Sequence, residues 1–538
     1  MSIPLNPRTH TDWLLLAGFC LFLFFYGLGS FGLLGADEPR YAQVAREMLE
    51  RRDWIVPTLG GQTWLEKPPL FYWQAMLAYA VFGVSDWAAR LPGALDATLL
   101  VMGVYFFLRR LHPGFALDGA LMAASTAAVV GFAHAASTDM PLAATFTLAM
   151  LSWYLWWKTS RRFELALFYI FLALAVLAKG PVAPLLAGVV IVLFALAAHD
   201  SRILLRALWI PGMVLFALLA LPWYVAIQVR RPEFFRVFIL EHNLERFSTN
   251  LYHHDQPFWF FAPVLLLGLL PWVVFIAVAA WETVRAWWSE PRAGFDSEAA
   301  LQVFLGLWLV VPVLFFSLSR SKLPGYILPA IPAGPVLLAE YVRRRVAQDA
   351  RLSPWLVGLH AVAAASPVLP ALMIHSVLLQ HRLPWNKGTL IASTVTLILA
   401  VGIALTLASK LGLRWVRFVT LIPVVIAVAA LVRIGAPWFD ADFSARPIAR
   451  ELARMETTPL PLAVVGVRRE TEYGLAFYRN QRISRYELRQ VPADQHLVVA
   501  PSGSMETIRR MVGERRVSFL GTYPGQALDY YWVAKASN

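Results

Sequence analysis

Residues 12–41 read DWLLLAGFCLFLFFYGLGSFGLLGADEPRY, an apolar run that ends abruptly in a charged stretch at 37–40. The run, about residues 12–34, is long enough to cross a bilayer, which takes roughly 20 apolar residues of helix. It is too long for a removable signal peptide and lacks a small-residue cleavage site, so we expect it to stay in place as an anchor. Ionised groups beside such a run are costly unless they pair or face a wet cavity. The positions of such charges along the chain are therefore evidence for both the fold and the function.

The composition is that of an integral membrane protein. Of the 538 residues, 58% are hydrophobic and only 15% are charged, whereas soluble proteins carry about 25% charged residues. The single cysteine, Cys20, excludes internal disulfides and thiol-based metal clusters. The net charge of +13 fits an orientation signal and contact with anionic membrane lipid. No nucleic-acid-binding module is visible, so nucleic acid is not an expected partner.

Apolar runs of membrane-spanning length recur along the first 434 residues. They predict an α-helical polytopic membrane protein with about thirteen transmembrane helices, at 12–34, 88–108, 116–136, 140–157, 163–179, 182–198, 207–228, 257–281, 300–318, 325–341, 354–376, 388–409 and 416–434. The stretch 68–83 is apolar but short and aromatic, which is typical of a helix lying in the membrane interface.

Lysine and arginine clusters fall in alternate loops, and such loops face the cytoplasm. The remaining loops then face outward, and every unusual polar residue of the chain falls in or beside them. The first of these loops, 35–87, contains apolar positions at helical spacing, which predict an amphipathic helix at about 38–51.

After residue 434 the charge density rises and no run is long enough to span a membrane. We expect a second domain at 435–538, a small α/β domain on the outer side, following a transmembrane domain at 1–434 that includes the 35–87 loop. The expected strands are 462–467, 496–500, 517–520 and 530–534, and the expected helices lie near 444–455, 471–479 and 503–513.

Several outward-facing charges also have ordinary structural explanations. Asp37 precedes Pro39 as a helix N-cap does, and Asp139 stands where it would cap the next span. Lys179 ends a span, where a cation is favourable and a lysine often snorkels to the headgroups. Glu66 and Lys67 have the spacing of a surface ion pair. The residues alone leave these alternatives open.

A divalent metal is a further alternative in the loop at 229–256. Helical spacing places His242 and Arg246 on one face, and a histidine near a carboxylate is able to bind Zn²⁺ or another divalent ion together with Glu66. Two protein ligands are too few for a structural zinc site. A Zn²⁺, Mg²⁺ or Mn²⁺ ion would therefore be exchangeable or bridged by substrate.

Together, the outward loops supply both signs of charge to one side of the membrane. The carboxylates suit a base or the stabilisation of a sugar cation, and the cations suit a phosphate leaving group. No nucleotide-binding loop is present, so a lipid-linked phosphate donor is favoured over a nucleotide sugar. A transporter or lipid flippase is the alternative of another class, but charges in the middle of the spans are nearly absent. The residues that carry this hypothesis are Asp37, Glu38, Glu66, Asp139, Lys67, Lys179, Arg246, Arg320 and Lys322.

Six motifs in order resemble those of the aminoarabinose transferases, which belong with the dolichyl-phosphate-mannose–protein mannosyltransferases in the GT-C superfamily of integral-membrane glycosyltransferases. The likeness covers about residues 12–435 and continues more weakly through the tail. The motifs are Gly-Ala-Asp-Glu-Pro-Arg-Tyr-Ala at 35–42, Leu-Glu-Lys-Pro-Pro-Leu at 65–70, Ser-Thr-Asp-Met-Pro at 137–141, Leu-Ala-Lys-Gly-Pro at 177–181, Glu-His…Glu-Arg-Phe at 241–247 and Ser-Lys-Leu-Pro-Gly-Tyr at 321–326.

The resemblance implies transfer of a sugar, 4-amino-4-deoxy-L-arabinose, from undecaprenyl phosphate to a lipid A phosphate, a modification tied to polymyxin resistance. It places the protein in the bacterial inner membrane, with its active site and its C-terminal domain in the periplasm. The same chemistry on another glycan or a protein acceptor stays open.

The resemblance also implies roles for individual residues. Asp37 corresponds to the catalytic carboxylate of the first loop, beside Glu38, and Asp139 to a second acidic cavity residue. Lys67 and Arg246 correspond to donor-phosphate ligands, Lys179 and Lys322 to further cations, and Tyr326 lies near the polyprenyl entrance. Glu66 and His242 match positions associated with a divalent metal.

Overall fold

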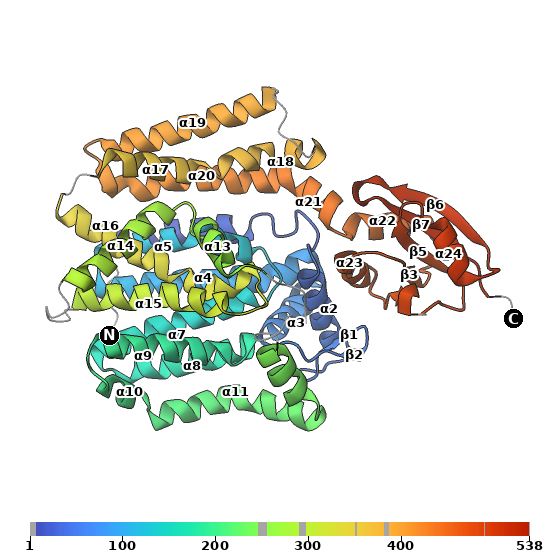
Figure 1. The fold of residues 1–538 in the computed structure, drawn as a ribbon, viewed down its shortest axis with the longest axis horizontal. Helices are drawn as coiled ribbons and strands as arrows, with labels where there is room; N and C mark the ends of the chain where they lie inside the picture. Colours follow the sequence, from blue (N-terminus) through green and yellow to red (C-terminus); the bar gives the residue numbers. More distant parts are fainter. Residues whose placement is uncertain are drawn as a thin grey trace. The chain divides into compact units, whose positions relative to one another are not determined.

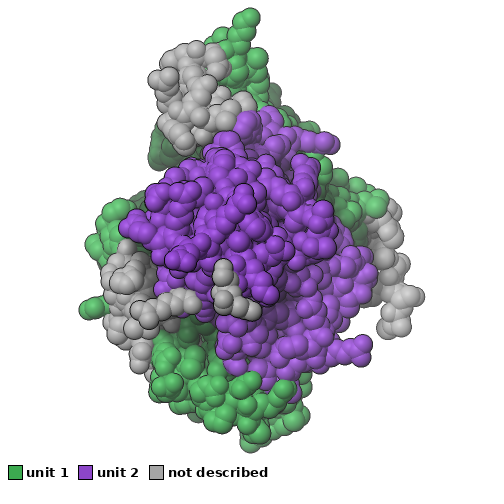
Figure 2. All heavy atoms as spheres, turned by 90° about the vertical axis from the view of Figure 1, so that its right-hand side faces the viewer, with its two compact units in different colours: residues 1–26, 65–71, 91–431 green, residues 27–64, 72–90, 432–538 purple. Residues whose placement is uncertain are grey.

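The computed structural model describes residues 7–245, 256–289, 297–349, 352–380, 387–488 and 490–536, and helices dominate the chain (Figure 1). The chain divides into two compact units, coloured in Figure 2. Unit 1 comprises residues 1–26, 65–71 and 91–431, and unit 2 comprises residues 27–64, 72–90 and 432–538. The predicted division at residue 434 places the first loop with the helical domain, whereas the compact units group most of that loop with the C-terminal residues.

Unit 1 is built of helices that coincide with the predicted spans. By length and composition, six helices in the described part of the chain are able to cross a membrane, and nine if each bent pair counts as one span. The elements are α1 (Pro7–Cys20), η1 (Leu21–Phe25), α4 (Asp86–Leu111, from residue 91 on), η2 (Pro113–Phe115), α5 (Ala116–Ala124), α6 (Ala127–Ala133), α7 (Asp139–Thr159), α8 (Arg162–Lys179), α9 (Val182–Ala197), α10 (Arg202–Ala207), α11 (Ile210–Arg230), η3 (Phe235–Glu245), η4 (Phe258–Phe260), α13 (Phe261–Gly268), α14 (Val273–Ser289), α15 (Ser297–Ser317), η5 (Pro324–Ala330), α16 (Ala333–Ala347), α17 (Pro354–Ala365), α18 (Val368–Gln380), α19 (Lys387–Ala408), η6 (Gly412–Trp415) and α20 (Val416–Ala430).

Four predicted spans differ from the observed helices, and the one predicted at 325–341 consists of η5 and α16, bent by 41°. The first ends at Phe25 rather than at residue 34. The span predicted at 116–136 consists of two helices bent by 61°, because the hydroxyls of Ser125 and Thr126 donate back to the carbonyls of Leu121 (2.7 Å) and Met122 (2.8 Å) and compete with the backbone ladder. The span predicted at 257–281 is bent by 117°, and Pro271 lies in the break, where it has no N–H to continue a helix.

Unit 2 contains the first loop. The predicted amphipathic helix is α2 (Asp37–Glu50), followed by the hairpin β1 (Thr58–Leu59) and β2 (Gln62–Thr63). The aromatic stretch forms α3 (Leu70–Phe82), whose residues from 72 on belong to this unit. The C-terminal elements are η7 (Leu431–Gly435, from residue 432 on), α21 (Ala436–Phe443), α22 (Arg446–Met455), β3 (Leu462–Val464), α23 (Arg469–Arg479), β4 (Ser484–Arg485), η8 (Tyr486–Leu488), β5 (His496–Pro501), α24 (Met505–Val512), β6 (Val517–Tyr523), η9 (Pro524–Gln526) and β7 (Leu528–Val533).

The C-terminal residues form the predicted α/β domain around one mixed sheet. Its strand order is β4-β3-β5-β7-β6, with β3 parallel to β4 and β5, and β7 antiparallel to β5 and β6. Alternate residues of β3 and β5 enter two separate cores, one formed with α22 and α23 and the other with α24. Covering both faces makes these strands continuously apolar. The two-residue strand β4 was not predicted, because Ser484 and Arg485 carry no such pattern.

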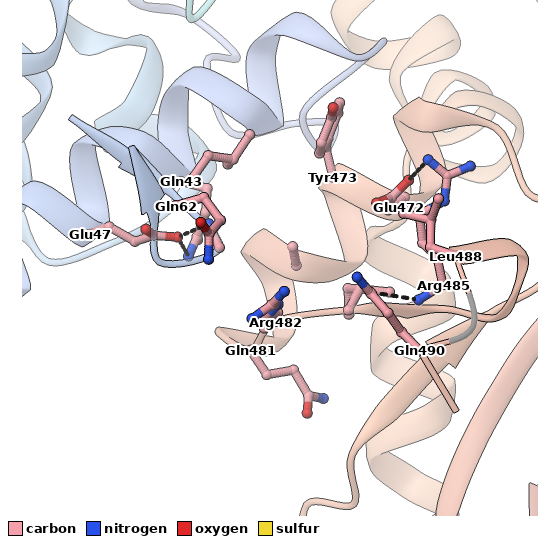
Figure 3. Close-up of a pocket in the computed structure, with 14 residues that line it drawn as sticks. Gln43, Glu47, Gln62, Glu472, Tyr473, Gln481, Arg482, Arg485, Leu488 and Gln490 are labelled. Atoms are coloured by element: carbon pink, nitrogen blue, oxygen red, sulfur yellow. Dashed lines mark hydrogen bonds and ion pairs between the residues drawn. The ribbon is translucent and has the colours of Figure 1, made fainter. Parts of the chain in front are cut away.

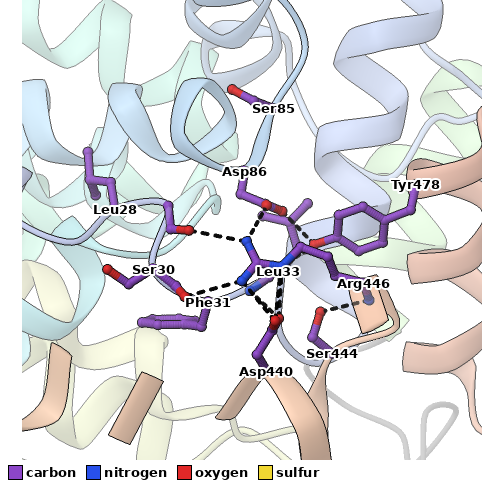
Figure 4. A network of polar contacts seen from close by, with 12 residues as sticks. Leu28, Ser30, Phe31, Leu33, Ser85, Asp86, Asp440, Ser444, Arg446 and Tyr478 are labelled. Carbon is purple, nitrogen blue, oxygen red and sulfur yellow. Dashed lines mark hydrogen bonds and ion pairs between the residues drawn. The ribbon is translucent and has the colours of Figure 1, made fainter. Parts of the chain in front are cut away.

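Arg446 joins the first loop to the C-terminal residues within unit 2 (Figure 4). Its guanidinium pairs with Asp86 and Asp440, both at 2.9 Å, and donates to the carbonyls of Gly29 and Ser30, both at 3.1 Å. A guanidinium is suited to this task because its donors point in fixed directions and are able to bind several acceptors at once. This network accounts for the grouping of the first loop with the C-terminal residues.

Asp529 on β7 is expected to stabilise the C-terminal sheet in a pH-dependent way. Burial acts to raise the pKa of Asp529, but hydrogen bonds from Gly503, Ser502, Thr522 and Tyr531, at 2.7–3.0 Å, outweigh it and hold the pKa below its ordinary value. A depressed folded-state pKa contributes stability that is present above the unfolded value of about 3.9 and is lost as the pH falls through the folded value.

Asp529→Asn is therefore expected to lower the opening free energy of the β6–β7 peptide by about 1–3 kcal/mol at pH 7, with a smaller difference below pH 4. Hydrogen exchange of the full chain in detergent measures this quantity. Asp494→Asn is the matched control, because the side chain of Asp494 is 72% exposed. Equal protection of wild type and Asp529→Asn at pH 7 would contradict the assignment.

Candidate active site

The hairpin of α7 and α8 brings two charged residues to one end of unit 1. Helix α7 begins at Asp139, and α8 ends at Lys179. The tight turn between them contains Ser160 in the left-handed conformation, so the helices run back along each other. A carboxylate at a helix N-terminus and an ammonium at a C-terminus are each favoured by the helix dipole. The hairpin therefore places opposite charges at its open end.

Asp139 and Lys179 form an ion pair there. The side chains are 19% and 12% exposed, respectively, and the Lys179 ammonium also lies 4.9 Å from the centre of the Tyr326 ring. The N-cap of α7 is Thr138, without a side-chain capping bond. Capping was thus the wrong explanation for Asp139, and Lys179 has a protein partner instead of only snorkelling.

Gly325 allows Tyr326 and Asp139 to lie this close. A Cβ atom at position 325 would stand 2.7 Å from the carboxyl carbon of Asp139, a distance that real Cβ contacts do not show. The motif at 321–326 therefore needs its glycine for the close approach of the turn η5 to α7.

An apolar groove adjoins this cluster. It has a volume of about 440 Å³ and lies between α6, α13 and η5. The turn η5 contributes Ile327 to the groove, while the neighbouring Tyr326 faces Lys179. On the other wall is Ala135, four residues before Asp139. Two residues that line the groove are thus close in sequence to members of the charged cluster.

Glu66 and His242 also lie together in unit 1, with His242 Nε2 3.9 Å from Glu66 Oε1. His242 belongs to η3, a π-helix, so the α-helical spacing predicted for this stretch is wrong. In the described part of the chain, no three His, Cys, Asp or Glu side chains gather as metal ligands. Catalytic zinc sites keep three protein ligands, so these two residues do not by themselves fit a zinc site, and no reaction step is assigned to a metal.

Three other predicted phosphate ligands differ in their surroundings. Lys67 is half-buried in the bend before α3. Lys322 is 6% exposed, and its ammonium donates to the carbonyls of Ser319 and Gln256, the latter at 3.0 Å. The Lys322 ammonium therefore stabilises the backbone segments that contain Ser319 and Gln256. Arg246 lies outside the described residues.

Asp37 and Glu38 belong to unit 2, at the start of α2. Asp37 pairs with Arg40, and its side chain is 49% exposed. The N-cap of α2 is Ala36, and no side-chain capping bond is present there. N-capping was therefore the wrong explanation for Asp37, whose carboxylate is held by a cation one turn along the helix.

Aromatic rings surround Arg40. Its guanidinium carbon lies 5.1 Å from the centre of the Tyr41 ring, 4.9 Å from that of Trp64 and 5.8 Å from that of Tyr473. Cation–π contacts at these distances are each favourable by about 0.5–2 kcal/mol. The rings restrict the guanidinium, which in turn orients Asp37. No sequence pattern singled out Arg40 beyond its place on the helix.

Glu38 is 8% exposed and is held by Arg90, which is fully buried. Arg90 Nη2 donates to Glu38 Oε2 at 2.7 Å, and Arg90 Nε donates to Glu38 Oε1 at 3.1 Å. The backbone N–H of Leu34 adds a third hydrogen bond at 2.7 Å. Sequence reasoning missed Arg90, although an arginine inside the apolar run 88–108 was a signal of a buried partner.

Comparison with known proteins agrees with the motifs. A family model described as dolichyl-phosphate-mannose-protein mannosyltransferase matches residues 12–238. The curated undecaprenyl phosphate-alpha-4-amino-4-deoxy-L-arabinose arabinosyl transferase of Pseudomonas aeruginosa (strain UCBPP-PA14) is 35% identical over 347 residues, 63% of this chain and 61% of the relative. A protein of that name, numbered 1, from Pseudomonas fluorescens (strain Pf0-1) is 30% identical over 387 residues, 68% of this chain and 66% of the relative.

The fold is also that of a solved member. ArnT from Cupriavidus metallidurans, in a crystal structure bound to undecaprenyl phosphate, superposes with a TM-score of 0.76 at 24% identity, covering 97% of this chain and 98% of that one. This confirms the predicted polytopic GT-C fold. In the sequence comparisons, the chain spans about 61% of the length of the first curated relatives it matches. By sequence and by fold, the chain is therefore similar to the aminoarabinose transferases, and its residues 12–238 match the dolichyl-phosphate-mannose–protein mannosyltransferase family model.

Proposed function

We propose that the protein is an integral-membrane glycosyltransferase that moves a sugar from undecaprenyl phosphate to a lipid A phosphate. The sugar is 4-amino-4-deoxy-L-arabinose, as in the names of the curated relatives, and the reaction takes place at the periplasmic face of the bacterial inner membrane. The observation that carries the proposal is the apolar groove of unit 1, whose lining residue Ile327 is the sequence neighbour of Tyr326 in the charged cluster with Asp139 and Lys179. The apolar groove suits the first isoprene units of a polyprenyl chain, and the Lys179 ammonium suits the phosphate of that lipid.

In the proposed reaction, the bond between the sugar C1 and the undecaprenyl phosphate oxygen breaks, and a bond from C1 to an acceptor phosphate oxygen forms. Undecaprenyl phosphate leaves with the electron pair. Lys179, with Lys67 and Arg246, holds this phosphate and stabilises its developing charge. Tyr326 lies at the lipid end of the cluster and lines the path of the polyprenyl chain.

The carboxylates have different parts in this proposal. Asp37 stabilises the positive charge that develops at C1, since glycosyl transfer passes through an oxocarbenium-like state. A lipid A phosphate is already anionic and needs little base assistance. Asp139 sets the position of the Lys179 ammonium. Glu38 is a positioning residue, because the described contacts of both its oxygens fix the start of α2.

Mass spectrometry of lipid A from a deletion strain, with and without a plasmid copy, tests the proposed function. The expected result is loss of the aminoarabinose-modified species on deletion and its return on complementation. Purified protein with undecaprenyl-phosphate-linked sugar and lipid A should reproduce the transfer. An unchanged lipid A profile would instead favour another acceptor for the same donor.

Lys179→Met is expected to lower kcat/KM for transfer by about 10²-fold, because removing one donor to a developing oxyanion costs roughly that much. Lys179→Arg, which keeps the charge, should retain more activity. Lys158→Met is the matched control, since Lys158 is exposed in the last turn of α7, at the opposite end of the same hairpin. If both methionine variants behave alike in membrane vesicles, Lys179 has no part in the transfer.

A further inference from the structure

Unit 2 contains a polar pocket that the proposed reaction does not use. Its volume is about 210 Å³, several times the roughly 30 Å³ that one water takes in the liquid. Figure 3 shows its two walls, one from α2 and the β1–β2 hairpin, and the other from α23 and the segment that follows it. Every residue that lines it belongs to unit 2.

Most charges in the pocket are already paired. Glu47 accepts hydrogen bonds from the hydroxyl of Thr58 at 2.7 Å and from the backbone N–H groups of Gly60 at 2.7 Å and Gly61 at 3.1 Å. Glu472 lies 3.5 Å from Arg485. These carboxylates hold the walls together and leave little negative charge to offer a ligand.

Two groups that line the pocket, in Gln43 and Arg482, are suited to a ligand. Gln43 is 5% exposed, and its amide oxygen is buried without a hydrogen-bond partner in the described part of the chain. An acceptor left in this way costs about 1–3 kcal/mol. Arg482 is exposed on the pocket wall, and none of the described hydrogen bonds or ion pairs engages its guanidinium. Among the described contacts, the pocket thus presents an unsatisfied acceptor in Gln43 and a cation without a partner in Arg482.

We propose that this pocket binds a negatively charged sugar, with Arg482 on its phosphate or carboxylate and Gln43 accepting from a sugar hydroxyl. Tyr473 and Gln62, which also line the pocket, supply an aromatic face and a further amide. A bare phosphate would leave most of the pocket empty. A neutral sugar would leave the Arg482 guanidinium without a partner.

The pocket shares α2 with Asp37, but within unit 2 it does not include Asp37. Arg40, Gln43 and Glu47 follow one face of α2, and Gln43 is six residues, about 9 Å of helix, from Asp37. Reacting atoms must approach to about 3–3.5 Å, so a sugar in the pocket is not the one transferred. This inference rests on the proposed function: the acceptor glycan binds in the pocket through a part that does not react. Binding energy from such a remote part of a substrate is able to lower the barrier at the reacting atoms.

The test is binding of glucose 1-phosphate to the full-length protein in detergent, measured by saturation-transfer NMR beside glucose and inorganic phosphate. The expected result is binding of the hexose phosphate, weakened at least fivefold by Arg482→Gln and by Gln43→Leu. Arg468→Gln is the matched control, since the side chain of Arg468 is 84% exposed and Arg468 does not line the pocket. Melting temperatures of all variants show whether each is folded.

Kinetics distinguish the source of the sugar. A fivefold rise in the acceptor KM of Arg482→Gln, with the donor KM unchanged, assigns the pocket to the acceptor glycan. Weakened hexose phosphate binding with both KM values unchanged assigns it to a free sugar phosphate. Either result supports the site. Binding that is absent in wild type, or equal in Arg482→Gln, overturns it, even where transfer is normal. Absent transfer with intact hexose phosphate binding would overturn the proposed function instead.

Discussion

Asp37→Asn is expected to reduce kcat for sugar transfer by about 10³-fold while leaving membrane expression and the melting temperature unchanged. Asparagine has the size of aspartate and keeps an oxygen for Arg40, but it lacks the charge that stabilises an oxocarbenium-like carbon. Charge placed in advance against a transition state is worth about 10²–10³-fold, and carboxylate catalysis contributes about 10²–10⁴-fold. The loss should appear in kcat, since a group that acts only in the transition state leaves substrate binding alone.

Glu50→Gln is a close control for Asp37→Asn. Glu50 also lies on α2, its side chain is 50% exposed, and it pairs with Arg46 at 3.0 Å. Like Asp37→Asn, Glu50→Gln therefore removes a half-exposed carboxylate that is paired with an arginine on the same helix. Turnover with radiolabelled donor in membrane vesicles compares the two. Equal activity of Asp37→Asn and Glu50→Gln would remove Asp37 from the chemistry, and a rise in donor KM alone would make it a binding residue.

Sequence patterns predicted the helical segments well, because apolar runs of membrane-spanning length have few alternatives. They failed where a local polar group or proline interrupts a run, as at Ser125, Thr126 and Pro271. The α/β domain was predicted because both faces of its central strands are covered, which leaves continuous apolar runs. The strand β4 has two residues and no such signal.

The sequence predicted which residues belong to the candidate site, but not which of them form ion pairs with one another. Asp139 and Lys179 were both expected in outward loops, yet capping and snorkelling explained each of them singly. Their ion pair follows from the lengths of α7 and α8, which return the chain to the same end. Glu38 was grouped with the catalytic residues because its neighbour Asp37 was. Its partner Arg90 lies 52 residues away, and a single sequence does not report contacts at that separation.

Arg90→Met is expected to destabilise unit 2 by about 3–5 kcal/mol, the cost of leaving one member of a buried ion pair uncompensated. Besides Glu38, the guanidinium donates to the carbonyls of Leu28 at 2.9 Å, Phe31 at 2.8 Å and Gly32 at 2.8 Å. Methionine fills a similar volume but satisfies none of these acceptors. Arg90→Lys should rescue little, because an ammonium lacks the planar fork that reaches Glu38 and three carbonyls together.

The double variant Glu38→Gln with Arg90→Met separates charge from packing. Removing the carboxylate relieves the uncompensated buried charge, so the double variant should melt higher than Arg90→Met alone, by an interaction energy of about 1–3 kcal/mol. Limited proteolysis of residues 27–64 and the melting temperature in detergent measure the effect, with Arg509→Met, whose side chain is 53% exposed, as the control. A double variant less stable than Arg90→Met would mean that Glu38 supports α2 without Arg90. The hydrogen bonds from Arg90 to the three backbone carbonyls would then account for its contribution to stability. Arg40 alone would then position Asp37.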